Sequence, residues 1–336
     1  MKALEVAYYI GYRVSRAYKT YKKKSLPYPV ISVGNLTLGG TGKTPAVIAI
    51  AEEGLTRGYK PCVLTRGYKG KIKKPVIVSK GNGPLCSPFD AGDEAFLMAE
   101  RLKGVEIIKS ADRYEGSLLS ENADLFILDD GYQNWKVHRD KDVLLIDSID
   151  PFGNDRLFPV GRLREPSSEV KRADAIIITR ASEEQNDLVE RLRTYNKDAA
   201  YYLAGVNASW LARHDGELFP TNELHRKRVY AFCGIGNPGS FIQSMLRCGV
   251  YLVGFKAFRD HHVYKDQNIE EIRQEAVKTR ADWVMMTEKD LVKLNSFKLP
   301  NNFIAMRIDF QIEKGFYDNI FNLNNTQKAE RNGGDR

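Results

Sequence analysis

The feature that most constrains this chain of 336 residues is a glycine-dense turn between a predicted strand and a predicted helix. The turn lies in VISVGNLTLGGTGKTP, from Val30 to Pro45, and the helical pattern AVIAIAEEGLTR follows it. Backbone N–H groups that glycine leaves uncovered converge on phosphate oxygens, Lys43 is placed to reach the β and γ phosphates, and the Thr44 hydroxyl suits Mg²⁺. We therefore predict a nucleoside triphosphate site formed by Thr37, Leu38, Gly39, Gly40, Thr41, Gly42, Lys43 and Thr44.

This turn departs in one place from the usual phosphate-loop pattern G-x-x-x-x-G-K-[ST]. Thr37 stands where the first glycine is expected, while Gly34, Gly39 and Gly40 lie nearby. The structural alternative is a glycine-rich strand-to-helix turn that ends in a chance Lys-Thr pair.

Paired aspartates follow a second apolar run. Leu125 to Leu128 is short and apolar, as expected of an interior parallel strand, and Asp129 and Asp130 come directly after it. Carboxylates at the carboxyl end of such a strand lie where phosphates arrive, so we predict that Asp129, Asp130 and Thr44 bind Mg²⁺. The alternative is that the aspartates only form a turn.

Alternating strand and helix patterns indicate an α/β fold. Short apolar runs recur at 30–33, 62–65, 76–78, 105–108, 126–128, 143–146 and 175–178, with helical patterns between several of them. We predict a P-loop NTPase-like, largely parallel sheet covered by helices on both faces, with a second, smaller α/β domain. The predicted units are a basic amphipathic helix at 1–24, a P-loop domain at 25–205, a smaller domain at 206–324 and a disordered tail at 325–336.

The net charge of +8 is concentrated at the amino terminus. Residues 1–24 hold seven basic side chains against Glu5 alone, a net charge of +6, so the remainder of the chain is nearly balanced. Nucleic-acid binders display a basic face on the folded domain itself, so this distribution argues against a nucleic-acid partner. The four cysteines, Cys62, Cys86, Cys233 and Cys248, show no metal-ligand or C-x-x-C spacing, so we predict reduced thiols in a cytosolic protein.

The same amino-terminal segment has the pattern of a helix with one apolar side. The residues that recur at spacings of three and four are Leu4, Tyr8, Gly11, Val14, Tyr18 and Tyr21. Tyrosines and basic residues together are typical of a helix that lies on an anionic membrane surface, and the segment is too charged to cross a bilayer or to act as a secretory signal. The alternative is an amphipathic helix packed on the protein's own core.

A second glycine pattern, Gly234 to Gly239 (GIGNPG), satisfies G-x-G-x-x-G after a predicted strand. The acidic residue expected about 20 positions later would be Asp260, which lies in an Arg-Asp-His-His loop, and Pro238 removes an N–H donor from the turn. We therefore interpret this pattern as a tight strand-to-helix turn.

Eight segments in order resemble one family. They are VGNLTLGGTGKTP, LTRGYK, AGDEAFLMA, ADRYEG, ILDDGYQNWKVHRD, GRLREP, FRDHHVY and TEKDLVKL, and they look like the tetraacyldisaccharide 4′-kinases, the lipid A kinases of bacterial outer-membrane synthesis. The resemblance runs from about Pro29 to Leu294. Two places deviate from the family pattern, at Tyr132 and at Asn134-Trp135, and both leave the aspartates intact.

The resemblance implies a kinase that uses ATP and Mg²⁺ to phosphorylate the 4′-hydroxyl of a lipid disaccharide 1-phosphate. It implies that Asp93 and His261 handle the proton of the acceptor hydroxyl, with one residue in each predicted domain, so that domain closure assembles the site. His262 is the alternative to His261, and a helix N-cap is the alternative role of Asp93.

The resemblance also implies where the acceptor binds and where the protein works. The residues that it suggests for the disaccharide or the transferring phosphate are Arg66, Gly67, Tyr68, Lys69, Arg113, Arg164 and Glu165, although each of them also suits a surface ion pair. It implies a monomer that is peripheral or monotopic on the cytoplasmic face of the bacterial inner membrane.

Two other functions fit part of this pattern. One is a P-loop kinase with a soluble acceptor, and the other is a nucleotide switch that hydrolyses ATP or GTP slowly. A switch has no need of the Asp93 and His261 pair, and the guanine motif N-K-x-D is absent from the sequence, with T-E-K-D at Thr287 to Asp290 only a distant echo.

Overall fold

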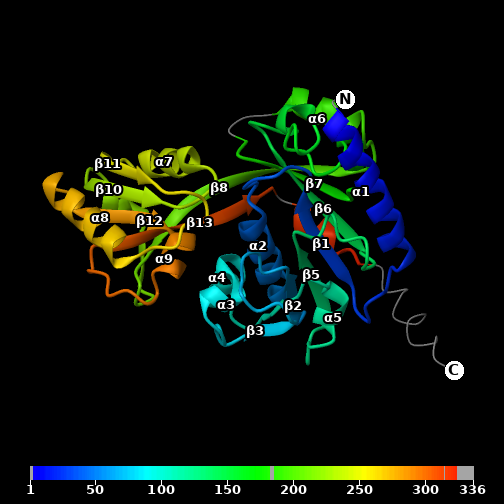
Figure 1. Ribbon diagram of the computed structural model, residues 1–336, viewed down its shortest axis with the longest axis horizontal. Coiled ribbons are helices and arrows are strands. Elements are labelled where there is room, and N and C mark those ends of the chain that lie inside the picture. The colour runs from blue at the N-terminus through cyan, green and yellow to red at the C-terminus, as the bar shows by residue number, and fades with distance from the viewer. Residues whose placement is uncertain (1–2, 182–184, 314, 324–336) are drawn as a thin grey trace.

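The computed structural model describes residues 3–181, 185–313 and 315–323, and Figure 1 shows their arrangement. Thirteen strands in this part of the chain form one mixed sheet in the order β11-β10-β12-β13-β8-β7-β6-β1-β5-β2-β4-β3, with β9 paired to β8. The strands are β1 (Val30–Asn35), β2 (Pro61–Thr65), β3 (Val76–Lys80), β4 (Glu106–Lys109), β5 (Leu125–Asp129), β6 (Lys141–Asp147), β7 (Ala175–Thr179), β8 (Ala200–Ala212), β9 (Leu218–Pro220), β10 (Arg228–Cys233), β11 (Tyr251–Ala257), β12 (Trp283–Thr287) and β13 (Phe303–Ile312).

Helices cover both faces of this sheet, as predicted. They are α1 (Ala3–Tyr21), α2 (Lys43–Thr56), α3 (Pro88–Ala91), α4 (Asp93–Arg101), α5 (Arg113–Ser117), α6 (Asn186–Arg193), α7 (Pro238–Arg247), α8 (Asp266–Lys278), α9 (Glu288–Lys293) and α10 (Phe316–Phe321), with 3-10 helices η1 (Gly153–Asp155), η2 (Ser167–Arg172) and η3 (Thr221–Leu224).

Strand β6 shows why the sheet is covered on both sides. Val143 and Leu145 pack in one cluster with α2, α4 and α10, whereas Leu144 and Ile146 pack in another with η2 and α6. Because successive side chains of a strand point to opposite faces, a continuous apolar run requires two covered faces. The parallel pairs of β1 with β5 and β6 confirm the predicted largely parallel sheet, and β3–β4, β8–β9 and β8–β13 are antiparallel.

The sheet has two halves that share one strand. We call β1–β7 with the helices on them the P-loop half, and β10–β13 with α7–α9 the distal half. Strand β8 pairs in parallel with β7 from Ala200 to Ala204 and then antiparallel with β13 up to Ala212, so it runs from one half into the other (Figure 1).

Two of the predicted domain assignments cross elements of this continuous sheet and its core. A boundary between residues 205 and 206 falls inside β8, and α10, which the prediction assigns to the smaller domain, packs Phe316, Ile320 and Phe321 into the core under α2. The division into two domains stays a prediction. The predicted disordered tail, residues 325–336, lies outside the described residues.

Helix α1 lies along the outer edge of the P-loop half (Figure 1). Its polar side faces inward. Glu5 is buried and pairs with Arg156 at 2.6 Å, and Tyr8 packs edge-on against Phe158. The opposite side exposes large apolar residues, namely Leu4, Val6, Ile10, Val14, Tyr18 and Tyr21. Within the described residues, every helix is too short or too polar to traverse a lipid bilayer.

Candidate functional site

The glycine turn joins β1 to α2 at the carboxyl edge of the sheet. Gly42 precedes α2 with φ +85°, a conformation that favours glycine, and a Cβ there would lie 3.1 Å from the Phe310 ring. The Thr41 hydroxyl oxygen is buried and has no hydrogen-bond partner among the described residues. An orphaned donor beside the free N–H groups of a helix start is the arrangement that an anion satisfies.

Lys43 points from the first turn of α2 toward the end of β5. Its Nζ donates to Asn35 Oδ1 at 3.0 Å and lies 3.6 Å from Asp130 Oδ1. The loop and the aspartates therefore belong to one pocket.

The two aspartates lie in different electrostatic surroundings. Asp129 is buried and accepts a hydrogen bond from Thr65 Oγ1 at 2.7 Å, and its burial, with the nearby Glu94 charge, raises its pKa to about 6. Burial acts to raise the pKa of Asp130 as well, but Lys43 and Arg164 outweigh it and hold that pKa below the usual range. Asp130 is thus held as a carboxylate well into the acid range, whereas Asp129 takes up a proton as the pH falls through about 6.

The donor set fits Mg²⁺. Thr44, Asp129 and Asp130 all line one cavity and offer hard oxygen ligands, which this ion prefers. Lys43 and Arg164 are the cations that pair with Asp130. Thr44 is the second residue of α2, the helix that follows the phosphate loop.

That cavity has a volume of about 1490 Å³ and continues well beyond the phosphate loop. One end is lined by Tyr12, Arg16 and Lys19 of α1, and the other by Ser240, Gln243 and other residues of α7. Its size and its position between the two halves of the sheet leave room for a nucleotide and a second, larger substrate.

Asp93 and His261 meet across the two halves. Asp93 begins α4, His261 lies in the loop after β11 with φ +58°, and its Nδ1 is 3.1 Å from Asp93 Oδ2. His261 lines the cavity and its ring lies 5.5 Å from the Tyr68 ring. His262 instead stacks on Phe258 and contacts Asn268 Oδ1 at 3.2 Å, so the geometry favours His261 over its neighbour.

A second pair lies beside this one. Lys289 of α9 contacts Glu94, which follows Asp93 in α4, and the Lys289 charge lowers the pKa of Glu94 against its burial. Both residues line the cavity. The first turn of α4 is therefore bound twice by the distal half.

The residues predicted to bind the acceptor separate into two groups. Arg66, Tyr68, Arg113 and Arg164 line the cavity. Arg113 is buried and donates to the carbonyl oxygens of Leu64, Ser110 and Asp129 at 2.6–3.1 Å, and burial lowers its pKa to about 10. Gly67, Lys69 and Glu165 do not line the cavity as described, so their contact with a substrate stays a prediction.

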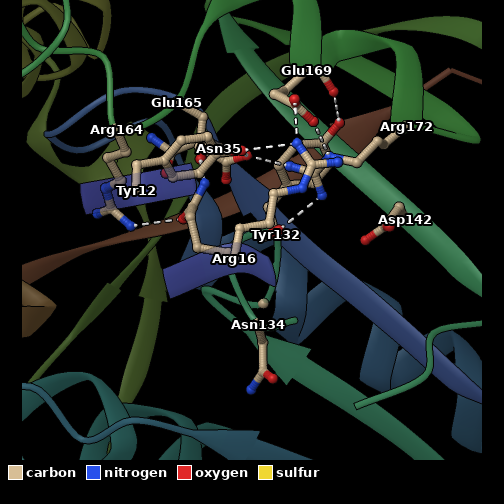
Figure 2. A network of polar contacts seen from close by, with 12 residues as sticks. Tyr12, Arg16, Asn35, Tyr132, Asn134, Asp142, Arg164, Glu165, Glu169 and Arg172 are labelled. Carbon is tan, nitrogen blue, oxygen red and sulfur yellow. Dashed lines mark hydrogen bonds and ion pairs between the residues drawn. The ribbon is translucent and has the colours of Figure 1, made fainter. Parts of the chain in front are cut away.

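Glu165 belongs instead to a buried polar network under α1, which Figure 2 shows. Its Oε2 accepts from Tyr12 Oη at 3.0 Å and from Arg172 Nη2 at 2.6 Å. Arg172 also donates to Glu169 at 2.8 Å, and Arg16 reaches Glu169 at 2.5 Å. The network fixes α1 to the P-loop half.

The sequence prediction missed several residues that shape the site. Asn35 holds Lys43, Thr65 holds Asp129, and Gln133 donates to the Asn35 carbonyl at 2.9 Å. Asn35 and Thr65 are the last residues of β1 and β2. Polar residues at the carboxyl ends of parallel strands could therefore have indicated these two site residues from the sequence. The Glu94–Lys289 pair joins residues far apart in the chain and had no such signal.

A phosphate loop at the carboxyl edge of a parallel sheet, with strand-end aspartates beside its lysine, defines a nucleotide-binding protein of the P-loop class. The family model described as "Tetraacyldisaccharide-1-P 4'-kinase" matches residues 2–324. The chain therefore belongs to the tetraacyldisaccharide-1-phosphate 4′-kinase family.

Individual relatives agree with this assignment. The chain is 41% identical over 286 residues to the tetraacyldisaccharide 4'-kinase of Desulfotalea psychrophila, covering 82% of this chain and 81% of the relative. It is 38% identical over 285 residues to that of Halothermothrix orenii, covering 79% and 74%. The crystal structure of LpxK from Aquifex aeolicus in complex with ATP matches with a TM-score of 0.77 and 33% identity, covering 95% of this chain and 97% of that one.

Proposed function

We propose that this protein transfers the γ-phosphate of ATP to the 4′-hydroxyl of a tetraacyldisaccharide 1-phosphate. The product is the 4′-phosphorylated lipid A precursor of lipopolysaccharide synthesis. The observation that carries the proposal, beside the family, is one cavity that contains the phosphate loop, Asp129, Asp130 and His261, with Asp93 behind His261. A nucleotide switch needs the loop but not a paired proton acceptor across two halves of the sheet.

The nucleotide phosphates bind the loop from Thr37 to Thr44. Lys43 and the first N–H groups of α2 stabilise the negative charge, and Thr41 Oγ1 gains the partner that it lacks. Thr44, Asp129 and Asp130 hold Mg²⁺, which supplies charge neutralisation of the phosphates when bound.

The acceptor oxygen attacks the γ-phosphorus and the bond to the β–γ bridging oxygen breaks, so ADP leaves. Asp93 and His261 receive the proton of the attacking hydroxyl as a pair. A sugar hydroxyl is a weak acid, and the imidazole 3.1 Å from the carboxylate shares the proton that a lone carboxylate would hold poorly. Arg66 and Arg164 contribute positive charge for the transferring phosphate or the substrate.

We propose that α1 places the enzyme on an anionic membrane surface. A helix of a water-soluble domain buries its apolar side, but α1 buries Glu5, turns the half-buried Tyr12 and Arg16 inward and exposes the apolar face given above. The cavity reaches α1 at Tyr12, Arg16 and Lys19, which suits a substrate whose acyl chains stay in the bilayer. The proposed location is the cytoplasmic face of the bacterial inner membrane, where the protein acts as a monomer.

The test is transfer of label from γ-labelled ATP to purified disaccharide 1-phosphate lipid in mixed micelles with Mg²⁺. We expect label on the lipid, and a Lys43→Ala variant that melts at the same temperature should transfer at least about 100-fold less. A soluble-acceptor kinase would leave this lipid unlabelled. A nucleotide switch would release labelled phosphate at the same rate with and without lipid.

A further inference from the structure

Two tyrosines of α1 hold consecutive residues of the loop before η2. The Tyr8 hydroxyl donates to the backbone carbonyl of Arg164 at 2.9 Å, and the Tyr12 hydroxyl donates to the Glu165 carboxylate at 3.0 Å (Figure 2 shows Tyr12, Arg164 and Glu165). Both contacts fall on the inward side of a helix whose other side is apolar and exposed.

Arg164 continues the connection to the site. Its Nη1 donates to both carboxylate oxygens of Asp130, at 2.9 and 2.8 Å, and to Gln133 Oε1 at 3.2 Å. Asp130 itself has φ +50°, a backbone conformation that few side chains adopt, so its orientation depends on surrounding contacts. Its other ion pair is with Lys43, at the longer distance of 3.6 Å, and Lys43 is the group that phosphate would engage.

Contacts of buried side chains anchor the loop that carries Arg164. Glu165 is completely buried, and Arg172 binds it and Glu169 together. The guanidinium groups of Arg16 and Arg172 lie 4.2 and 4.1 Å from the centre of the Trp135 ring. Hydrogen bonds to charged groups in such surroundings fix geometry strongly, since no water replaces a lost partner.

We infer that Tyr8 and Tyr12 are positioning residues for phosphoryl transfer: from the membrane-facing helix they fix Arg164, and through it the carboxylate of Asp130. The inference rests on the proposed function in one respect, the assignment of Asp130 as a ligand of the metal that accompanies ATP. It gives α1 a role inside the site that is separate from membrane contact.

The test compares three full-length proteins: wild type, the Tyr8→Phe/Tyr12→Phe double variant and a Tyr18→Phe control. Tyr18 lies on the same helix with its side exposed, so the control removes a hydroxyl from the outward face. Two measurements are made, Mg²⁺-dependent ATP binding by calorimetry, and hydrogen exchange of amides 130–134 without metal or nucleotide.

We expect the double variant to need about tenfold more Mg²⁺ for half-maximal ATP binding, as expected for the loss of two hydrogen bonds that act indirectly. The Gly131 N–H donates to the Val33 carbonyl and the Asn134 N–H donates to the Gly131 carbonyl. Amides 130–134 should exchange faster in the double variant, because these hydrogen bonds open more often when Asp130 is held less firmly. The Tyr18→Phe control should match wild type in both measurements.

Unchanged exchange and unchanged Mg²⁺ dependence in the double variant would overturn the inference and leave the proposed kinase reaction standing. Wild-type ATP binding that is independent of Mg²⁺ would instead contradict the metal assignment in the proposed function. In that case the exchange rates of amides 130–134 still decide whether α1 positions Asp130.

Discussion

Asp93 Oδ2 lies 3.1 Å from His261 Nδ1, although 168 positions separate the two residues in the chain. Asp93 is supplied by α4 of the P-loop half and His261 by the loop after β11 of the distal half. The pair therefore exists only while both halves of the sheet are in place, and in the proposed reaction it is the contact by which the distal half would help to receive the proton.

Removal of either member of this pair should slow turnover more than it weakens ATP binding. We expect Asp93→Asn and His261→Gln each to lower kcat by at least about 100-fold, because the attacking hydroxyl loses its proton acceptor. Steady-state kinetics and ATP calorimetry separate the two effects. His262→Gln is the matched control and should keep near-normal kcat, and a variant that lost ATP affinity with kcat intact would contradict the assigned role.

The pKa of Asp129 gives a pH dependence of stability. The value is 3.8 in the unfolded chain and about 6 in the folded protein, so the folded state binds this proton more tightly. The contribution of Asp129 to the free energy of unfolding is therefore complete below about pH 4 and disappears as the pH rises through about 6, a change of roughly 3 kcal/mol. Urea unfolding of wild type and Asp129→Asn between about pH 4 and 7 measures it.

As the pH rises across this window, the free energy of unfolding of wild type should fall by that amount relative to Asp129→Asn. A constant difference between them would show that Asp129 titrates at its ordinary pKa.

Charge on the outward side of α1 should release the protein from membranes. Ile10 and Val14 are 57% and 65% exposed, so Ile10→Glu/Val14→Glu leaves the inward contacts of Tyr8, Tyr12 and Arg16 in place. We expect the double variant to sediment far less with vesicles that contain anionic lipid, because it loses apolar contact and adds negative charge. Thr20→Glu is the control for one added negative charge outside the apolar face and should sediment more than the double variant. Equal sedimentation of all three proteins would favour a helix that serves only the fold.

Arg101 should contribute more to stability than an exposed arginine. Its side chain is 7% exposed and pairs with Glu288 at 3.3 Å and with Asp309 at 2.7 Å, thereby joining α4 to the distal half. Arg101→Ala leaves the Glu288 carboxylate, which is only 13% exposed, without this cation, so we expect a loss of about 3 kcal/mol in the free energy of unfolding. Arg57→Ala, which removes exposed pairs with Glu53 and Asp318, should cost about 1 kcal/mol or less.

The phosphate loop and the aspartate pair were predictable because their signals are local. Each lies at the end of an apolar strand, and the sheet edge brings strand ends together, so Lys43 and Asp130 were expected to be neighbours and are 3.6 Å apart. The resemblance supplied Asp93 and His261, which no local pattern relates.

The path of β8 was not predictable in the same way. Its second part, AGVNASWLA, mixes small and polar residues and gives weak strand periodicity, yet it pairs along its length with β13 near the chain's end. Pairing between distant segments is decided by tertiary contacts. For α1, periodicity showed an apolar side but not its direction, and Tyr8, predicted on that side, turns inward to Arg164.

The shared strand β8 determines how the enzyme can open. The P-loop half and the distal half are connected through the β8–β13 ladder, so separating Asp93 from His261 requires that ladder to bend or twist as an elastic ribbon. In the proposed reaction, any opening that admits a bulky lipid would therefore strain two adjacent strands, and the stiffness of those strands would favour the return of the reacting groups to contact.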